Sequence, residues 1–307
     1  MTKNQLKIVF IGTPDFAVAS FKAILDAGFN VVAAITAPDR PAGRGLKLQE
    51  SAVKKFAVEN GIPVFQPTNL KNPDFQEELR SYQADIQVVI AFRMLPESVW
   101  SMPKFGTFNL HASLLPAYRG AAPINRAIMN GETETGVSTF FLQHEIDTGN
   151  IVFSAKTAID PDENAGELHD RLMELGAGLV VKTLEAVCEG EYPETPQVMS
   201  DYIPLAPKIF KCDCRLDPNW PIEKLFNHIR GLSPYPGAFT NFRDKQLKIF
   251  AAEKLEKEAS KAVGEWEIID RKALHWHCSD GALNITDLQL EGKRRMKTEE
   301  LLRGLQL

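Results

Sequence analysis

The chain has 307 residues, 24% of them charged and 44% hydrophobic, and a formal net charge of -5. This composition is that of a folded globular protein with one or two domains, and it excludes a disordered or fibrous chain. No apolar run approaches the roughly 18 to 20 residues of a membrane-spanning helix, and the first residues lack the apolar core of a signal peptide. We therefore expect a cytoplasmic protein with no membrane partner.

Short apolar runs and amphipathic stretches alternate in the first part of the chain. We predict strands at 6–11, 31–35, 64–65 and 86–91, and helices at 17–27, 51–60 and 74–81. This alternation is typical of right-handed βαβ crossovers, so we predict an α/β fold with a mostly parallel, doubly wound (Rossmann-like) sheet. Ligands of such sheets bind beyond the carboxyl ends of the strands, which here are Gly12, Thr36, Ala91 and His111.

The segment 37–45 reads A-P-D-R-P-A-G-R-G and interrupts this alternation. Two prolines and two glycines predict a loop without regular structure. Its Arg40 and Arg44 suit a lid that orders on an anionic partner such as RNA. A solvated surface loop is the alternative interpretation.

Two polar side chains end the strand predicted near residue 109. The stretch 105–123 reads F-G-T-F-N-L-H-A-S-L-L-P-A-Y-R-G-A-A-P, and Asn109 and His111 are two positions apart. Alternate residues of a strand project to the same side, so this amide and this imidazole point toward one place. A helix is expected to begin near Pro123, because proline is tolerated in the first turn, and its free amide groups would lie nearby.

Two further strands, 136–143 and 151–158, are predicted to form a hairpin whose turn holds Asp147-Thr148-Gly149. An isolated Asp-Thr-Gly is most often only a turn. A carboxylate beside an imidazole, however, can orient the ring and stabilise its charged form. Asp147 and His111 are therefore candidate acid–base partners if the fold brings them together.

A long helix, 167–188, is followed by a proline-rich stretch, and we predict three segments: a first domain at 1–189, a linker at 190–208 and a second domain at 209–307. The second domain shows a helix at 222–230 and short strands at 238–242, 247–252, 266–269, 275–278 and 283–290. Such spacing predicts a small, OB-like β-barrel. Barrels of this kind bind nucleic acids or serve as inert covers.

The positive charge of the chain is concentrated toward its C-terminal end. Residues 209–307 carry 17 Lys and Arg against 15 Asp and Glu, a net +2, whereas residues 1–208 carry -7. Lys293, Arg294 and Arg295 form the densest basic cluster, and Lys208 precedes the domain. These residues are candidates for contacts with a phosphate backbone, or they form a solvated face.

Several cofactors are not favoured by the sequence. Residues 12–16, G-T-P-D-F, do not fit the G-x-G-x-x-G dinucleotide fingerprint, and a Walker A sequence is absent. Cys212, Cys214, His275, His277 and Cys278 do not have the spacing of a usual zinc site, so we expect no metal. The 4 cysteines are few and unevenly spaced, which argues against a disulfide framework.

Four short motifs resemble the signature of the folate-dependent formyltransferases. They are Asn109-Leu110-His111, the stretch S-L-L-P at 113–116, the stretch R-G-A-A-P at 119–123, and I-D-T-G at 146–149. Over its whole length the chain is similar to the members of that family that act on methionyl-tRNA. The resemblance implies 10-formyltetrahydrofolate as the formyl donor, tetrahydrofolate as the product, and initiator methionyl-tRNA as the acceptor.

The resemblance also implies roles for particular residues. The formyl donor is expected to contact Ser113, Leu114, Leu115, Pro116 and Ala91. The tRNA is expected to contact Arg40, Arg44, Lys208, Lys293, Arg294 and Arg295, with Arg44 the stronger candidate within the loop. The chain departs from the family at 91–96, which reads A-F-R-M-L-P instead of A-Y-G-x-I-L-P and leaves Arg93 without a role.

We hypothesise that Asn109 and a protonated His111 stabilise the oxyanion of the tetrahedral intermediate, while Asp147 keeps the imidazole charged and relays a proton. Ser113 is expected to shape the loop and not to act as a nucleophile. A formyltransferase acting on an amino sugar or a purine precursor is an alternative, and so is a non-catalytic RNA-binding protein on a transferase scaffold. We expect a monomer.

Overall fold

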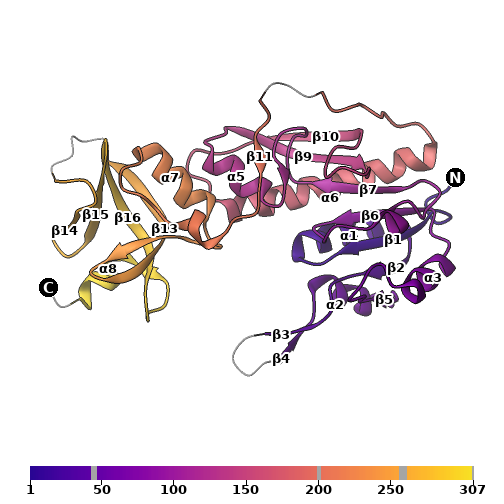
Figure 1. Cartoon of the computed structure of the whole chain (residues 1–307), viewed down its shortest axis with the longest axis horizontal. Coiled ribbons are helices and arrows are strands. Elements are labelled where there is room, and N and C mark those ends of the chain that lie inside the picture. Colours follow the sequence, from indigo (N-terminus) through magenta and orange to yellow (C-terminus); the bar gives the residue numbers. More distant parts are fainter. Residues whose placement is uncertain (43–46, 199–201, 256–260, 306–307) are drawn as a thin grey trace. The chain divides into compact units, whose positions relative to one another are not determined.

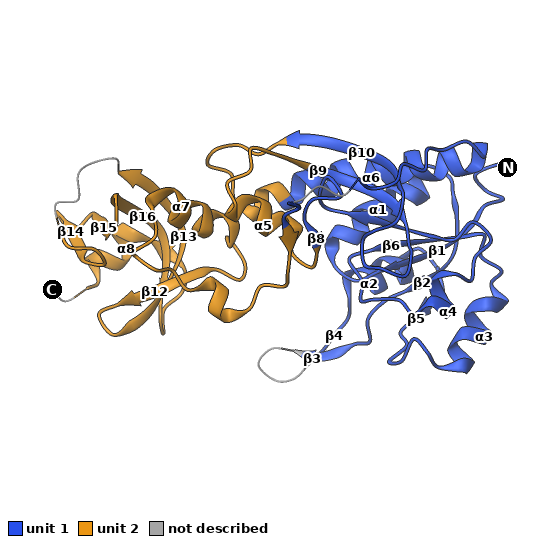
Figure 2. Ribbon diagram, turned by 45° about the horizontal axis from the view of Figure 1, so that its top comes forward, with its two compact units in different colours: residues 1–119, 136–157, 169–204 blue, residues 120–135, 158–168, 205–307 orange. Residues whose placement is uncertain are grey.

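The structure is a computed structural model that describes residues 1–42, 47–198, 202–255 and 261–305. The chain divides into two compact units, which Figure 2 shows in different colours. One unit comprises residues 1–119, 136–157 and 169–204, and the other comprises residues 120–135, 158–168 and 205–307. A mostly parallel sheet and a separate antiparallel sheet are both present, so the predicted α/β fold with a second β domain is confirmed.

The first unit is built on a seven-stranded sheet in the order β10-β9-β7-β6-β1-β2-β5 (Figure 1). Its strands are β1 (Lys7–Gly12), β2 (Asn30–Ile35), β5 (Val64–Phe65), β6 (Ile86–Ile90), β7 (Thr107–His111), β9 (Glu134–Phe141) and β10 (Ile151–Ala158). The strands from β7 to β5 pair in parallel, and β9 runs antiparallel to β7. This mixed sheet joins the stretch around residue 109 to the hairpin that follows it.

Helices cover both faces of this sheet. Successive side chains of a strand point to opposite faces, and the buried strands therefore present apolar side chains to helices on each side. Phe10 of β1 stacks on Phe21 of α1, with ring centroids 4.3 Å apart. Val9 and Ile11 point to the other face, where they share a buried cluster with residues of α3 and α4. The helices of this unit are α1 (Asp15–Asp26), α2 (Ala52–Glu59), α3 (Pro73–Ser81), α4 (Glu97–Trp100) and α6 (Ala165–Glu189).

Local sequence explains where several of these helices begin. The Ser51 hydroxyl accepts a hydrogen bond from the Lys54 amide at 3.0 Å and caps α2. Asn72 caps α3 in the same way, and proline occupies the first turn of that helix, where a missing N–H costs nothing. Capping of this kind fixes the helix starts that the sequence predicted within one or two residues.

The strand order reverses between β1 and β6, and Gly12 ends β1 at this point. A Cβ atom on Gly12 would lie 2.7 Å from the Cβ of Ala17 and 2.9 Å from the carbonyl oxygen of Ile90. Only glycine therefore allows this close approach of helix and strand. The carboxyl ends of β1, β6 and β7 meet along this edge, as expected for a ligand-binding sheet.

The prediction that residues 37–45 lack regular structure was wrong for residues 40–42, and its residues 43–45 lie outside the described part of the chain. Strand β3 (Arg40–Ala42) pairs antiparallel with β4 (Lys47–Gln49). A two-stranded ribbon has only edge strands, so Pro41 can occupy one without removing a hydrogen bond from a central ladder. Asp39 anchors the base of this hairpin: it is ion-paired with Lys54, and it accepts a hydrogen bond from Gln66 at 2.7 Å.

The second unit contains an antiparallel sheet in the order β12-β13-β16-β15-β14, with β17 pairing β16. Its strands are β12 (Ala238–Phe242), β13 (Lys245–Leu255), β14 (Trp266–Ile269), β15 (Ala273–Cys278), β16 (Gly281–Leu290) and β17 (Met296–Lys297). Trp266 and the fully buried Trp276 stack with ring centroids 5.4 Å apart. Leu225 and Ile229 of α7 complete the same apolar core.

The remaining elements of the second unit are helical or very short. They are α5 (Pro123–Met129), the 3-10 helix η1 (Lys211–Cys214), α7 (Ile222–Gly231), α8 (Thr298–Arg303) and β11 (Leu205–Ala206), which pairs with Gly120 of β8 (Arg119–Gly120). Asn125 of α5 donates a hydrogen bond to the Gly231 carbonyl of α7 at 2.7 Å. No helix within the described part of the chain is long and apolar enough to cross a membrane.

Candidate active site

His111 is the last residue of β7, and its ring is buried between two partners. Its Nε2 lies 2.8 Å from the carbonyl oxygen of Tyr118. A carbonyl can only accept, so Nε2 carries a proton. Nδ1 then faces Asp147, whose Oδ2 lies 3.9 Å away. The structure thus brings the predicted imidazole and carboxylate together and fixes which ring nitrogen faces the acid.

Asp147 sits in the turn between β9 and β10 in a backbone conformation with φ of 56°. Positive φ is uncommon for a residue with a side chain and is concentrated at functional sites and tight turns. Two residues later, a Cβ on Gly149 would lie only 1.7 Å from the carbonyl oxygen of Phe141. The turn can therefore pass this close to β9 only with glycine at position 149.

Asn109 lies two residues before His111 and on the same face of β7. In the sheet it is level with Val89 of β6 and Phe140 of β9. It is half-buried, and within the described residues its carboxamide has no hydrogen-bond partner. An amide donor at the mouth of the sheet is thus left for a ligand.

The loop at 113–116 is fixed by hydrogen bonds to neighbouring residues. The Ser113 hydroxyl is buried and donates to the Ala117 carbonyl at 2.6 Å, which fits a role in shaping the loop. Ser138 of β9 donates to the Ser113 carbonyl at 2.8 Å and accepts from the Leu115 amide at 3.2 Å. Sequence reasoning did not single out Ser138, although it belongs to the G-V-S stretch that precedes I-D-T-G.

Leu114 contributes to the same loop through its side chain. A Cβ on Gly136, at the start of the G-V-S stretch, would lie 2.6 Å from the Leu114 Cδ2 atom and 2.1 Å from the Ala155 carbonyl oxygen. Glycine at 136 therefore lets the 113–116 loop pack directly on the hairpin. The S-L-L-P motif is thus in contact with the start of the hairpin that carries Asp147.

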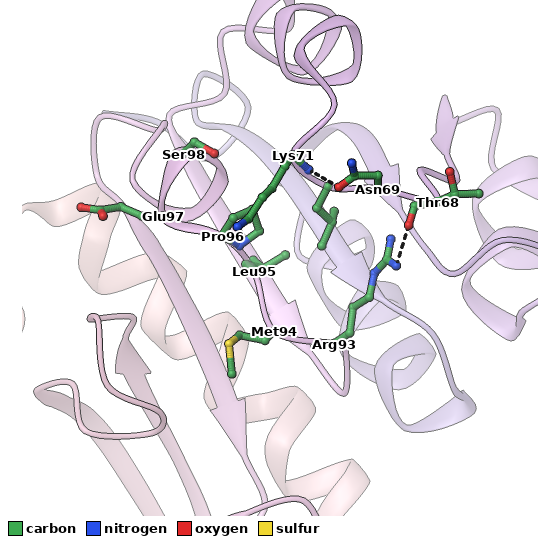
Figure 3. Close-up of a pocket in the computed structure, with 10 residues that line it drawn as sticks. Thr68, Asn69, Lys71, Arg93, Met94, Leu95, Pro96, Glu97 and Ser98 are labelled. Atoms are coloured by element: carbon green, nitrogen blue, oxygen red, sulfur yellow. Dashed lines mark hydrogen bonds between the residues drawn. The ribbon is translucent and has the colours of Figure 1, made fainter.

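Ala91 follows β6 directly, is exposed, and has a positive φ of 48°. Beyond it, a surface pocket of about 580 Å³ opens between the segments 68–71 and 93–98 (Figure 3). Arg93, which had no role in the sequence analysis, donates hydrogen bonds to the carbonyls of Thr68, at 3.1 Å, and Pro67. Its guanidinium thereby ties these two segments together at the point where the chain departs from the family motif.

This pocket is separate from the three catalytic candidates. Its lining is mainly apolar, and none of Asn109, His111 and Asp147 belongs to it. Three charged residues belong to the lining, the positive Lys71 and Arg93 and the negative Glu97 (Figure 3). The catalytic candidates instead line the sheet edge formed by the end of β7 and the Asp147 turn.

Some of the basic residues predicted to contact tRNA form ion pairs with acidic side chains, and others do not. Arg295 forms two hydrogen bonds with Asp287, at 2.8 and 3.1 Å, and Arg294 is ion-paired with Glu300. Within the described residues, Lys293 has no acidic partner within ion-pair distance. The cluster is therefore less positive than its sequence suggested.

The other basic candidates lie outside this cluster. Arg40 is exposed on β3, and Lys208 is exposed with its ammonium 5.7 Å from the centre of the Phe210 ring. Arg44 lies outside the described residues. The role of each in RNA binding stays a prediction.

The cysteines of the second unit are placed differently from one another. Cys214 and Cys278 belong to the apolar core, and burial raises the pKa of both thiols, whereas Cys212 is exposed. His277 faces Glu267 across the sheet, with 3.2 Å between Nε2 and Oε2. Within the residues that the structure describes, no group of three or more His, Cys, Asp and Glu side chains is placed to hold a metal ion.

Comparison with known proteins places this chain, with its Rossmann-like sheet and separate antiparallel sheet, among the transferases. The chain belongs to the formyl transferase family: residues 6–184 match the family described as "Formyl transferase", and residues 208–306 match "Formyl transferase, C-terminal domain". It is 49% identical over 315 residues to the methionyl-tRNA formyltransferase of Bacteroides fragilis. This match covers 100% of the present chain and 97% of the relative.

Solved structures share the fold at lower identity. HypX from Aquifex aeolicus, solved with tetrahydrofolic acid, is 19% identical with a TM-score of 0.66, and the match covers 96% of this chain and 46% of that chain. This chain therefore spans about half the length of HypX. An N-formyltransferase from Helicobacter canadensis, solved with folinic acid and dTDP-3-aminofucose, is 20% identical with a TM-score of 0.65, covering 96% and 100% of the two chains.

Proposed function

We propose that this protein transfers the formyl group of 10-formyltetrahydrofolate to the amino group of initiator methionyl-tRNA. The observation that carries this proposal is the full-length match, at 49% identity, to a protein named methionyl-tRNA formyltransferase. The arrangement of Asn109, His111 and Asp147 at one edge of the sheet supports formyl transfer as the chemistry. Tetrahydrofolate is the second product.

The reaction joins the methionine nitrogen to the formyl carbon and breaks the bond between that carbon and the folate nitrogen. The formyl oxygen gains negative charge in the tetrahedral intermediate. The free carboxamide of Asn109 donates to this oxygen, and so does the Nδ1 of a protonated His111, because Nε2 is already bound to the Tyr118 carbonyl. Loss of one such donor typically lowers the rate by ~10²–10³.

One proton must move from the attacking nitrogen to the leaving nitrogen. Asp147 accepts this proton from the new ammonium through a water molecule and passes it to the folate nitrogen as the carbon–nitrogen bond breaks. Its carboxylate oxygen lies 3.9 Å from Nδ1 of His111, so the proton donor and the proton acceptor of the reaction face the same place. No covalent enzyme intermediate is needed. The Ser113 hydroxyl is consistent with this, because it already donates its hydrogen bond to the Ala117 carbonyl.

The segments that flank this site hold the two substrates in the proposal. Residues 113–116 and Ala91 contact the folate, and the 113–116 loop is pre-shaped for this by Ser138. Arg40 and Arg44 contact the acceptor end of the tRNA. Lys208 and the cluster 293–295 contact its phosphate backbone, with the segment 209–307 as the tRNA-binding domain, 1–189 as the catalytic domain and 190–208 as the linker.

A transfer assay with defined substrates tests this function. Purified protein is incubated with 10-formyltetrahydrofolate and charged initiator tRNA, and the aminoacyl ester is released and analysed by mass spectrometry. The proposal expects the added mass of one formyl group on methionine, and only with both substrates present. Formylation of a nucleotide-linked amino sugar or a purine precursor in place of methionine would overturn it, and tRNA binding without transfer would indicate a non-catalytic protein.

We further propose that the protein acts as a monomer in the cytoplasm, where charged initiator tRNA and reduced folates are both present. Size-exclusion chromatography with light scattering measures the mass of the free protein and of its tRNA complex. The proposal expects one chain in each, and a mass of two chains would contradict it. Exchange of initiator for elongator methionyl-tRNA measures the selectivity for the acceptor.

A further inference from the structure

Gln197 lies in the segment that follows α6, and its side chain contacts the turn that holds Asp147. Its Nε2 donates to the carbonyls of Asp147, at 2.9 Å, and Gly149, at 2.8 Å. Its Oε1 accepts from the Nε and Nη2 atoms of Arg119, at 3.1 and 2.5 Å. Both donors and the acceptor of one amide are thus used within the site.

The partners of Gln197 allow only one orientation of its amide. Carbonyl oxygens can only accept and a guanidinium can only donate, so Nε2 must face the turn and Oε1 must face Arg119. A glutamate at this position would place a second acceptor against the two carbonyls. The contacts therefore require an amide, and a carboxylate of the same size does not meet them.

Arg119 connects this amide to the residues that hold His111. It follows Tyr118, whose carbonyl accepts from the His111 Nε2 at 2.8 Å. The amide of Tyr118 in turn donates to the Pro204 carbonyl at 2.6 Å. Gln197 therefore bridges the turn that carries Asp147 and the segment that carries the imidazole's carbonyl partner.

The segment that carries Gln197 is itself anchored to the sheet. Thr195 and Ile151 exchange two backbone hydrogen bonds, at 2.9 and 3.0 Å, at the start of β10. The turn needs such support, because Asp147 adopts a positive φ that a residue with a side chain rarely adopts unaided. Support from outside the turn offsets this backbone strain.

We propose that Gln197 is a positioning residue for formyl transfer: it sets the separation between Asp147 and His111 by tying their two backbone segments together. The proposal rests on the proposed function only in naming the reaction. Gln197 acts through backbone carbonyls and Arg119, and it does not touch the reacting atoms. Its loss is therefore expected to lower turnover without weakening the binding of either substrate.

Two variants and a matched control test this role. Gln197→Met keeps the length of the side chain and removes all four hydrogen bonds. Gln197→Glu keeps the contact with Arg119 but places a carboxylate oxygen, which cannot donate, against the carbonyls of Asp147 and Gly149. Gln76→Met is the control, since Gln76 also donates twice, to the Leu70 carbonyl at 2.9 Å and the Ser98 hydroxyl at 2.8 Å, away from the catalytic candidates. All three are compared with the parent for thermal midpoint, kcat and KM.

A misplacement of about 1 Å in an active site lowers rates by up to ~10²-fold, so we expect kcat to fall ~10- to 100-fold in Gln197→Met, with both KM values within about twofold of the parent. The kcat of Gln197→Glu is expected to fall further than that of Gln197→Met. Gln76→Met is expected to keep kcat while its thermal midpoint falls. A Gln197→Met enzyme with parental kcat, or with a loss confined to KM, would overturn the proposal.

A second measurement does not depend on transfer activity. The imidazole ¹⁵N shifts of His111 report its hydrogen bonding, and we expect them to change in Gln197→Met and to stay unchanged in Gln76→Met at the same pH. Parental shifts in Gln197→Met would overturn the positioning role. If the parent protein shows no formyl transfer, the proposed function fails, but this comparison still decides whether Gln197 positions His111.

Discussion

The Nδ1 atom of His111 lies 3.9 Å from Oδ2 of Asp147, and these side chains are only 8% and 16% exposed. This separation is longer than a hydrogen bond, so the two groups face each other across a gap. Catalytic hydrogen bonds are often long before substrate binds and shorten in the complex. The gap therefore leaves Nδ1 without a direct hydrogen bond to this carboxylate, so that Nδ1 can contact a substrate oxygen.

Asp147→Asn tests the charge of this carboxylate. The amide has nearly the same size, but it carries no negative charge and cannot accept a proton from the new ammonium. Proton transfer by a placed side chain contributes ~10²–10⁴-fold, and we expect kcat to fall by that range with KM for both substrates little changed. Single-turnover formylation under saturating substrates measures it, and a decrease of less than threefold would exclude a proton-transfer role.

Asn109→Ala removes a donor that has no partner among the described residues of the protein itself. Because no intramolecular hydrogen bond is lost, we expect the thermal midpoint to stay within about 1 °C of the parent, a change below about 1 kcal/mol. The rate is expected to fall ~10²–10³-fold, as for other oxyanion donors. Stable protein with full activity would show that the amide faces no developing charge.

The sequence predicted most of the sheet because its signals are local. Apolar runs, helix caps and the alternation of strands and helices each depend on residues a few positions apart, and β1, β2, β5 and β6 lie within one or two residues of their predicted bounds. The pairing of β3 with β4 was missed because the two prolines and two glycines of 37–45 predict a loop. Proline excludes a central strand, but not one strand of a two-stranded ribbon.

The candidate site was only partly visible in the sequence. Asn109, His111 and Asp147 belong to short motifs with recognisable chemistry. Gln197 is 50 residues from Asp147 along the chain, and nothing near it in the sequence marks its contact with the turn. The partial neutralisation of Arg295 by Asp287 was likewise hidden, because the two are brought together only by the pairing of β16 with β17.

Gly149→Ala tests whether the Asp147 turn depends on its close approach to β9. The new Cβ would lie 1.7 Å from the Phe141 carbonyl oxygen, which is backbone and cannot rotate away. We expect a loss of about 1–3 kcal/mol in the free energy of unfolding, as for other overpacked sites, together with lower kcat because Asp147 is displaced. Urea unfolding followed by circular dichroism measures the first effect. Gly178→Ala is the control, since apart from its chain neighbours and the adjacent backbone of its own helix no atom lies within 4 Å of its added Cβ.

Asp287 makes the stability of the second unit dependent on pH. Burial raises the pKa of its carboxyl, but the hydrogen bonds and charge of Arg295, with the charge of Lys297, outweigh burial and hold the pKa below its usual value of 3.8. A lowered pKa stabilises the folded state above the unfolded pKa, and this stabilisation is lost as pH falls through the folded pKa. We expect the urea midpoint of the parent to decrease more than that of Asp287→Asn between about pH 5 and pH 3. Equal decreases would contradict this assignment.

Lys293→Ala and Arg295→Ala compare two basic residues of the cluster 293–295 that differ in whether an acidic side chain is paired with them. Lys293 has no acidic partner among the described residues, whereas Arg295 is bound by Asp287. Each phosphate contact in a duplex contributes about 0.9 to the slope of log affinity against log salt concentration. We therefore expect Lys293→Ala to reduce the magnitude of the slope for tRNA binding by about 0.9. Arg295→Ala is expected to change the slope less, because breaking its ion pair with Asp287 already costs part of any phosphate contact. Filter binding at several salt concentrations measures both slopes, and a larger change for Arg295→Ala would show that tRNA displaces Asp287.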